Sequence, residues 1–403
     1  MRCRSCQSNS LKSIIPLGKL PLANALIEKT NVEKSKLYNL EVMLCEECAL
    51  VQLKDSVAPE DLFSHYFYFS SNSSTMLESA QNLVESLLPQ LNEDSQIVEI
   101  ASNDGYLLKN YMGKGFKVLG IEPAKNVAKV ARESGIETLC EFFDANLAKK
   151  IAHSGMKADI IHANNVMAHV PDINSFVKGV KILLKQTGVA VIEVPYFLDL
   201  IEKLEFDTIY HEHVFYFTLK ALKGLFNKNG LLISGFEKLK IHGGSLRLFI
   251  AHEDNNTESA DLEGAIFQEE LKGLYNLETY KGFMRRLEDL KENLLDKLQS
   301  LKNDQKKIAA YGASAKGTTL LNYFGIRKEL IDFVVDKSSA KIGKLLPGTY
   351  LEIKNPEALI EEDVDTALLL TWNFAEEILK EQQKFLDKNK TFLCPLPYVR
   401  EIS

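Results

Sequence analysis

The sequence has few cysteines, one tryptophan and no long apolar run. No stretch of 18 consecutive apolar residues occurs among its 403 residues. A transmembrane helix needs about 20 such residues, so no membrane span is expected. Met1-Arg2-Cys3-Arg4 leads into a cysteine motif rather than an apolar stretch, so no signal peptide is predicted. These absences favour a protein of the reducing cytoplasm.

The charge balance argues against a nucleic-acid partner. The formal net charge is −7, and the sequence contains no Lys/Arg-rich run. Binding to phosphates of DNA or RNA requires a concentrated basic surface. The hydrophobic fraction of 45 % and charged fraction of 26 % are typical of a globular protein, and the length allows two or three domains.

Four of the six cysteines form two pairs, Cys3-x-x-Cys6 and Cys45-x-x-Cys48. Two such knuckles can close a tetrahedral Zn²⁺ site, and four thiolates leave no open position for catalysis. The sequence therefore predicts a structural zinc module over residues 1–65. Two disulfides or four unrelated thiols are the alternatives. Pro16-Leu17-Gly18 and Leu20-Pro21-Leu22 are interpreted as turns, and residues 38–44 as a strand.

Strands and helices alternate from residue 66 onward. This alternation predicts an α/β fold with a doubly wound, Rossmann-like parallel sheet. Helical spacing of Leu, Phe and Met over residues 254–305 predicts a connector, and a second α/β unit follows over residues 306–403. Strands are expected at residues 97–100, 118–121, 160–163, 189–194, 307–311, 331–336 and 366–370, and helices at 75–91, 126–134 and 173–184.

The loop after the first of these strands has the character of a cofactor site. It runs from Glu99 to Gly105 and lacks both Gly-x-Gly-x-x-Gly and a P-loop lysine. Glu122 ends the next strand, where a carboxylate can accept both ribose hydroxyls. An acidic loop with such a carboxylate suits S-adenosylmethionine (SAM), which carries an ammonium and a sulfonium. An ordinary turn with a solvated Glu122 is the alternative.

Several further motifs occur in one order along the chain. They are Gly120-Ile121-Glu122-Pro123-Ala124, Glu141-Phe142-Phe143, residues 162–170 (His-Ala-Asn-Asn-Val-Met-Ala-His-Val), Glu193-Val194-Pro195-Tyr196, Tyr210-His211-Glu212-His213 and His242-Gly243-Gly244-Ser245-Leu246-Arg247. Together with the cysteine pairs they resemble the nucleotide-sugar C-methyltransferases, a family that makes branched deoxysugars. The resemblance covers nearly the whole chain.

The resemblance implies a zinc module, a SAM-dependent core over residues 66–253 and a C-terminal Rossmann-like domain that helps to hold the diphosphate of the sugar nucleotide. The methylated carbon lies next to the keto group of a nucleotide-linked 4-keto-deoxysugar, with TDP as the expected nucleotide. Carbon 3 is the commoner position in the family, and carbon 5 is also used. A monomer or small homo-oligomer is expected.

The site residues implied by the resemblance fall into three groups. The catalytic residues are Tyr210, Glu212, His213 and His169. The cofactor-binding residues are Tyr68, Glu99, Ala101, Asn103, Gly105, Glu122, Phe142 and Asn164. The substrate-binding residues are Asn165, Tyr196, Arg247, Ser314 and Lys316.

The proposed reaction explains why such residues are needed. A carbon nucleophile must first lose a proton next to a carbonyl, and His213 titrates in the useful range for a base. Tyr210 and His169 are expected to donate hydrogen bonds to the oxyanion, and Glu212 to orient an imidazole or a sugar hydroxyl. A catalytic metal on His211 and His213 is an alternative, as is a purely structural role for His169. His211 has no assigned role.

Two other segments leave alternatives open. The stretch from Tyr66 to Ser74 mixes aromatic and hydroxyl side chains and is either a lid over the cofactor or a linker; the resemblance favours the lid. The loop from Tyr311 to Thr319, with Asp336 after the next strand, suggests a dinucleotide site, but Ser314 replaces its middle glycine. The competing functions are an NAD(P)-dependent nucleotide-sugar oxidoreductase and an RNA or small-molecule methyltransferase.

Overall fold

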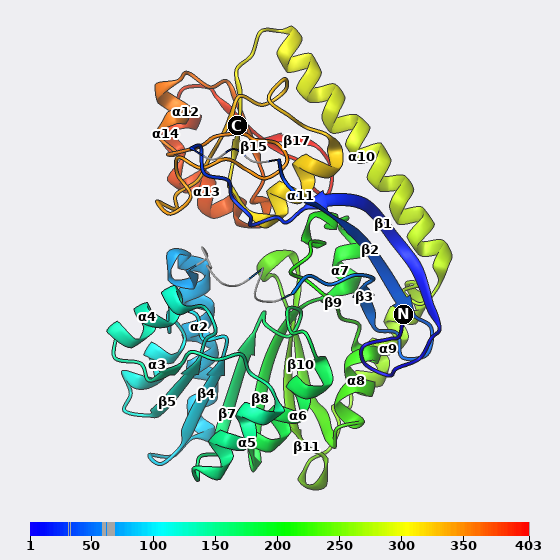
Figure 1. Ribbon diagram of the computed structural model, residues 1–403, viewed down its shortest axis with the longest axis vertical. Helices are drawn as coiled ribbons and strands as arrows, with labels where there is room; N and C mark the ends of the chain where they lie inside the picture. Colours follow the sequence, from blue (N-terminus) through cyan, green and yellow to red (C-terminus); the bar gives the residue numbers. More distant parts are fainter. Residues whose placement is uncertain (31, 33, 59–61, 63–68, 403) are drawn as a thin grey trace.

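The computed structural model describes residues 1–30, 32, 34–58, 62 and 69–402, which form three sheets with helices around them (Figure 1). A four-stranded sheet belongs to the N-terminal module, a seven-stranded sheet lies in the middle of the chain and a six-stranded sheet lies near the C-terminus. The predicted α/β fold class is confirmed. Among the described residues, no helix is both long and apolar enough to span a membrane.

The N-terminal sheet is antiparallel and includes a strand from the middle of the chain. Its strands, in spatial order, are β1 (Leu11–Pro21), β2 (Leu37–Cys45), β3 (Val51–Leu53) and β9 (Phe215–Tyr216). The turns expected at Pro16 and Pro21 are wrong, because both residues lie within β1. An edge strand tolerates proline, which donates no ladder hydrogen bond, and two register shifts along β1 absorb the irregularity.

The central sheet has five parallel strands, followed by β11, which pairs antiparallel with both β8 and β10. Its strands, in spatial order, are β6 (Thr138–Leu139), β5 (Lys117–Ile121), β4 (Gln96–Ile100), β7 (Ala158–Asn164), β8 (Leu184–Pro195), β11 (Ser245–His252) and β10 (Leu231–Leu239). The residues of β4 are buried almost throughout, as expected for a parallel strand covered on both faces. The carboxyl ends of β4, β5 and β7 share one edge, where open α/β sheets bind ligands.

Helices cover this sheet and begin at polar caps. Ser73, Asp144 and Asp172 each accept a backbone N–H of the first turn, which satisfies donors that have no partner within the helix. The helices and short 3-10 turns of this part are η1 (Ser70–Asn72), α2 (Ser74–Leu87), η2 (Leu88–Gln90), α3 (Leu108–Met112), α4 (Lys125–Glu133), α5 (Ala145–His153), α6 (Ile173–Leu183), α7 (Phe197–Glu202), η3 (Phe206–Thr208), α8 (Leu219–Asn227), η4 (Ile241–Gly243) and η5 (Glu253–Asn255).

The C-terminal sheet repeats the strand succession of the central sheet. Its spatial order is β14 (Ile353–Lys354), β13 (Phe333–Val335), β12 (Ile308–Tyr311), β15 (Thr366–Leu369), β16 (Thr391–Cys394) and β17 (Arg400–Ile402). The first five strands are parallel and the last is antiparallel. Its helices are α11 (Ala315–Phe324), α12 (Ala358–Glu361), η6 (Trp372–Phe374), α13 (Ala375–Glu381) and α14 (Gln383–Leu386).

Two helices connect these sheets, α9 (Leu262–Leu271) and the long α10 (Leu277–Asn303). The buried side chains of α10 recur every three or four residues, which gives one apolar stripe. They are Tyr280, Phe283, Leu287, Leu290, Leu294 and Leu298. Figure 1 shows the N-terminal hairpin of β1 and β2 lying alongside α10 and extending toward the C-terminal sheet.

Candidate functional site

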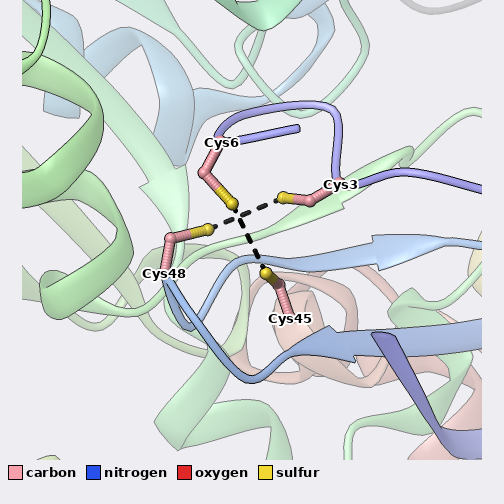
Figure 2. A group of neighbouring side chains, drawn as sticks. All are labelled: Cys3, Cys6, Cys45 and Cys48. Atoms are coloured by element: carbon pink, nitrogen blue, oxygen red, sulfur yellow. Dashed lines mark hydrogen bonds between the residues drawn. The ribbon is translucent and has the colours of Figure 1, made fainter. Parts of the chain in front are cut away.

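The four N-terminal cysteines converge on one point (Figure 2). The Sγ atoms of Cys3 and Cys48 lie 3.6 Å apart, as do those of Cys6 and Cys45, and all four lie within 4.8 Å of one another. A disulfide would require about 2.05 Å. Four thiolates at roughly 2.3 Å from Zn²⁺ are separated by roughly 3.8 Å in a tetrahedron. The residues therefore fit a Zn²⁺ site, as the sequence predicts.

Both knuckles close by the same turn. The backbone N–H of Gln7 donates to the carbonyl of Cys3 at 3.0 Å, and that of Ala49 donates to the carbonyl of Cys45 at 2.9 Å. Gln7 and Ala49 both have positive φ, 66° and 59°. The turns aim each pair of thiols at the same point, which prepares the site for the metal.

A second metal site at the histidines is not supported. Among the described residues, the four cysteines are the only cluster of three or more possible His, Cys, Asp or Glu ligands. The Nε2 atom of His211 lies 3.3 Å from the carbonyl of Tyr38, whereas Nδ1 of His213 lies 2.9 Å from the carbonyl of Thr208. The two rings therefore bond different carbonyls, and His211 connects its segment to β2.

The loop after β4 is hydrogen-bonded to Glu122, which directly follows β5. One Glu122 oxygen accepts the backbone N–H of Asn103 at 3.0 Å, and the other accepts that of Ala124 at 2.8 Å. Ala101, Asn103 and Gly105 all have positive φ, between 50° and 79°. A Cβ on Gly105 would lie 2.1 Å from Ile136, so only glycine allows the loop to pack this closely.

Several buried side-chain oxygens at this edge have no hydrogen-bond partner in the described part of the chain. They are Glu99 Oε2, Ser102 Oγ, Asp104 Oδ1, Asn164 Oδ1 and Asn165 Oδ1. Burial, together with the charges of Asp104 and Glu122, raises the pKa of Glu99 well above its usual range. Buried acceptors of this kind suit a ligand that brings positive charge and hydroxyl donors. This set of acceptor oxygens fits SAM.

The described end of the predicted lid contacts the cofactor loop. The backbone N–H of Ser70 donates to Asn103 Oδ1 at 2.9 Å, and the hydroxyl of Ser71 donates to Asp104. Tyr68, predicted to bind the cofactor, lies outside the described residues. Phe142 follows β6 and its side chain is 45 % exposed, so it is open to a ligand.

Tyr210 and His213 form a hydrogen-bonded pair. The hydroxyl of Tyr210 lies 2.8 Å from His213 Nε2, and the two ring centroids are 4.1 Å apart. The Thr208 carbonyl 2.9 Å from Nδ1 can only accept, so Nδ1 carries the hydrogen. The neutral ring then has its lone pair on Nε2, facing Tyr210. His213 is buried, which shields this pair from water.

His169 joins this pair through Glu212. The Nδ1 atom of His169 donates to the backbone carbonyl of Glu212 at 2.8 Å, and its ring lies 4.7 Å from that of His213. Burial lowers the pKa of His169 to about 4, although the carbonyls of Glu212 and Asn165 oppose this. Burial raises the pKa of Glu212 to about 7. Tyr210, Glu212, His213 and His169, called the tetrad below, thus lie together.

The predicted substrate residues of the central sheet differ in their surroundings. Asn165 follows β7, has φ 55° and donates its backbone N–H to the Glu193 carbonyl at 2.8 Å. Tyr196 is 1 % exposed, with its ring against Lys238 of β10. The guanidinium of Arg247 is held by Glu193 at 2.7 Å and Glu237 at 3.2 Å. A phosphate would have to compete with these carboxylates for Arg247.

The C-terminal loop is ordered by its own side chains. Ser314 caps α11 by accepting the Gly317 N–H at 3.0 Å. Asp336 accepts the backbone N–H of Ala313 at 2.8 Å, much as Glu122 accepts that of Asn103. The Nζ atom of Lys316 lies 4.5 Å above the ring of Trp372.

Sequence reasoning missed two groups that the structure brings to this region. Glu205 and Asp207 are buried next to the tetrad segment, and Asp207 accepts the indole N–H of Trp372 at 2.7 Å. Burial raises the pKa of Glu205 to about 7, which the charge of Lys316 opposes. The other is Asn24 of the N-terminal module, which contacts Glu212. Neither group belongs to a motif, so only tertiary structure reveals them.

Comparison with known proteins follows these three parts of the chain. Family models match residues 3–63 ("Putative zinc binding domain"), 73–233 ("Methyltransferase domain") and 240–397 ("C-methyltransferase C-terminal domain"). The C-methyltransferase NovU of Streptomyces niveus is 33 % identical over 406 aligned residues, which cover 100 % of this chain and 96 % of NovU.

Other relatives match a smaller share of the chain. A ubiquinone biosynthesis O-methyltransferase of Bartonella quintana is 26 % identical over 35 % of this chain and 62 % of that protein. The solved magnesium protoporphyrin IX methyltransferase of Synechocystis, with bound SAM, is 12 % identical, covers 44 % of this chain and 79 % of its own, and has a TM-score of 0.34, too low to support an argument. From the full-length similarity to NovU and the three matched domains, the chain belongs to the C-methyltransferase family as a SAM-dependent enzyme with a zinc-binding N-terminal module.

Proposed function

We propose that the enzyme methylates the carbon next to the keto group of a nucleotide-linked 4-keto-deoxysugar, with TDP as the nucleotide and carbon 3 as the position. The observation that carries this proposal is the Tyr210–His213 pair, with a hydroxyl and an imidazole lone pair 2.8 Å apart. Such a pair can bracket a keto oxygen and the hydrogen on the neighbouring carbon. Hydroxyl or amine acceptors would need no enolate stabilisation.

Cofactor binding in this proposal uses the loop after β4. Glu122 holds the ribose hydroxyls, Glu99 and Asp104 face the positive charge, and Asn164 and Phe142 complete the site. Bound SAM supplies the methyl group as an electrophile. The short 3-10 turn over Ser70–Asn72, which contacts Asn103 and Asp104, helps to exclude water.

His213 is the base of the proposed mechanism. Its Nδ1–H is fixed on the Thr208 carbonyl, so Nε2 is the atom that takes the proton from the sugar carbon. The electron pair left on the carbon spreads to the keto oxygen and forms an enolate. The Tyr210 hydroxyl turns from Nε2 to this oxygen and stabilises its charge. The carbanionic carbon would then be ready to take the methyl group of bound SAM. The bond from sulfur to this methyl group would break with its electron pair left on sulfur, giving a neutral thioether, while His213 holds the abstracted proton.

His169 supports the base rather than the oxyanion. A neutral imidazole has one N–H, and that of His169 is donated to the Glu212 carbonyl. With a pKa lowered to about 4, the ring stays neutral near pH 7, and its Nε2 can only accept. These properties support Tyr210 as the proposed oxyanion donor.

The C-terminal domain, residues 306–403, is proposed to hold the diphosphate. The start of α11 presents backbone N–H groups, and Ser314 and Lys316 lie there. Asn165, Tyr196 and Arg247 are proposed to contribute to the sugar site from the central sheet. The ion pairs of Arg247 with Glu193 and Glu237 favour a role in holding the pocket's shape.

The test is incubation with SAM and a panel of TDP-, GDP- and UDP-linked 4-keto-6-deoxysugars in D₂O, followed by mass spectrometry and NMR. We expect a gain of one methyl group on carbon 3 of a TDP-sugar. Without SAM, solvent deuterium should appear at the same carbon, because deprotonation precedes transfer.

The control is the corresponding 4-hydroxy sugar, which cannot form an enolate and should gain no carbon-bound methyl group. Methylation of a hydroxyl oxygen, or no methylation of any sugar despite SAM binding, would refute the substrate class. A stabilising response to NAD(P)H in thermal unfolding would instead favour an oxidoreductase.

A further inference from the structure

A side chain of the zinc-binding module reaches the tetrad. The Nδ2 atom of Asn24 lies 2.8 Å from both carboxylate oxygens of Glu212, although 188 residues separate the two in sequence. Within the described part of the chain, no other side chain bonds this carboxylate. We propose that Asn24 is a positioning residue of the methyltransferase site, holding the Glu212 carboxylate in orientation and in its charged form. The inference rests on the proposed function of the tetrad.

Hydrogen bonds between the zinc-binding module and the tetrad segment hold Glu212 in place opposite Asn24. The segment after His213 is paired into the module's sheet, because β9 lies beside β3 and the Leu53 N–H donates to the Val214 carbonyl at 2.8 Å. His211 also lies against the module, with its Nε2 atom 3.3 Å from the Tyr38 carbonyl. The module therefore holds the tetrad segment at three places.

The other side of Asn24 is fixed to the C-terminal domain. Three residues farther along, Ile27 exchanges two backbone hydrogen bonds with Leu345, at 2.9 and 2.8 Å. Glu28 pairs with Lys344 at 2.6 Å. The position of Asn24 thus depends on both the zinc module and the docking of the C-terminal domain. This links the proposed diphosphate site to the carboxylate of the tetrad.

Because Glu212 is buried, its negative charge depends on the hydrogen bond from Asn24. Glu212 is only 4 % exposed, and loss of water disfavours its charge; the Asn24 amide is the group that favours it. Among the residues that the structure describes, the titratable groups on the segments around Glu212 are His169, Tyr210, His211, His213 and Tyr38. None of them is a permanent cation, so the amide of Asn24 has no charged substitute there.

The test compares Asn24→Ala and Asn24→Asp with the unchanged full-length enzyme. A hydrogen bond to a charged group is worth roughly ten- to a hundredfold in an equilibrium, so kcat at pH 7 should fall by about that factor. The KM for SAM should stay within about threefold of the unchanged enzyme. The acid limb of the kcat–pH profile should move upward by about one unit or more in Asn24→Ala, and farther in Asn24→Asp, where two carboxylates compete for charge.

Asn174→Ala is the matched control. Asn174 also joins the module to the core, by donating its Nδ2–H to the Arg4 carbonyl at 2.7 Å, but it has no hydrogen bond to Glu212. We expect its pH profile to match that of the unchanged enzyme. Zinc content and thermal unfolding report whether each variant folds, and Asn24→Asp preserves the side-chain size.

A readout without substrate separates this inference from the proposed function. Infrared difference spectra identify the Glu212 carboxyl as the band lost in Glu212→Gln, and its titration should move to higher pH in Asn24→Ala. An unmoved titration, or an activity loss equal at every pH, overturns the role of Asn24. A moved titration in an enzyme that methylates no keto-sugar overturns the proposed function and leaves the positioning contact standing.

Discussion

Individual side chains of the tetrad are assigned by their hydrogen-bond partners. The Thr208 carbonyl fixes a hydrogen on Nδ1 of His213, and the Glu212 carbonyl fixes one on Nδ1 of His169. The Nε2 atom of His213 lies 2.8 Å from the hydroxyl of Tyr210. This contact underlies the proposed roles of His213 as the base and of His169 as a supporting residue.

The roles of His213 and Tyr210 predict different losses. His213→Ala should lower kcat by roughly 10²–10⁴, the usual contribution of general-base catalysis. Tyr210→Phe should lower it by roughly 10²–10³, the usual effect of one oxyanion donor. Solvent deuterium exchange without SAM should disappear in His213→Ala. SAM affinity, measured by calorimetry, should stay within a few-fold in both variants.

His153→Ala is the control, because His153 lies exposed on α5 and bonds only locally to the Lys149 carbonyl. Its kcat should equal that of the unchanged enzyme. Full turnover in His213→Ala would exclude this histidine as the base.

At the scale of elements, the zinc knuckles support the site through a strand. β9 starts two residues after His213 and completes the sheet of β1, β2 and β3. The turn after β2 carries two of the four thiols, Cys45 and Cys48. A structural metal can therefore affect chemistry without touching substrate, because it orders the sheet to which the tetrad segment is paired.

Removal of one thiolate tests this link. Cys45→Ser should lower the zinc content, measured by atomic absorption, well below one ion per chain. Loss of a structural metal site should lower Tm by on the order of 10 °C, since each kcal/mol shifts Tm by roughly 2–4 °C in domains of this size. At temperatures where the variant remains folded, kcat should also fall, because Asn24 loses its support.

Cys140→Ser supplies the comparison, because Cys140 lies outside the module, with its thiol 3.5 Å from the Pro123 carbonyl. Its zinc content and Tm should match those of the unchanged chain. A zinc-free, folded Cys45→Ser enzyme with full kcat would contradict the link between the module and the tetrad.

The sequence is informative about elements whose signals are local. The apolar strands around residues 98, 119 and 161 and the helices near residues 80, 130 and 178 occur where periodicity predicts them. β1 was mistaken for turns, because proline and glycine are also tolerated on a bulged edge strand. Tyr210, Glu212 and His213 are close together because one short segment contains them. Asn24 is distant from them in sequence, so only the tertiary fold shows that it contacts Glu212.

At the scale of the whole molecule, the core and the C-terminal domain meet at a charged junction. Phe206 stacks on Phe324 of α11 with ring centroids 4.9 Å apart, which supplies the apolar part of the contact. Beside it lie the buried carboxyls of Glu205 and Asp207 and the amine of Lys316. We therefore expect docking of the C-terminal domain to depend on whether these carboxyls carry charge, and so on pH.

Lys316→Met should weaken this junction slightly below about pH 7 and increasingly above it. Burial raises the pKa of Glu205 from 4.5 to about 7, and Lys316 holds it lower than burial alone would. Between about pH 4.5 and 7 the unfolded chain loses this proton before the folded one, so stability falls with rising pH in both proteins. Above about pH 7, Glu205 of the unchanged chain is ionised in the folded state as well, so this group causes no further loss of stability.

In Lys316→Met the pKa of Glu205 rises further, so the stability of the folded state continues to fall above pH 7. The Tm difference between the two proteins should therefore be small and constant from pH 5 to 6.5 and should widen from pH 7 to 9, as measured by differential scanning calorimetry. The constant part reflects the lost contact with the Trp372 ring, which does not titrate. Lys337→Met is the control. Lys337 pairs with Glu377 and Glu381 of α13 rather than with Glu205, so its Tm difference should not widen with pH. A Tm difference for Lys316→Met that is equal at every pH would show that the amine acts by packing alone, and that the carboxyls at the junction do not govern docking of the C-terminal domain.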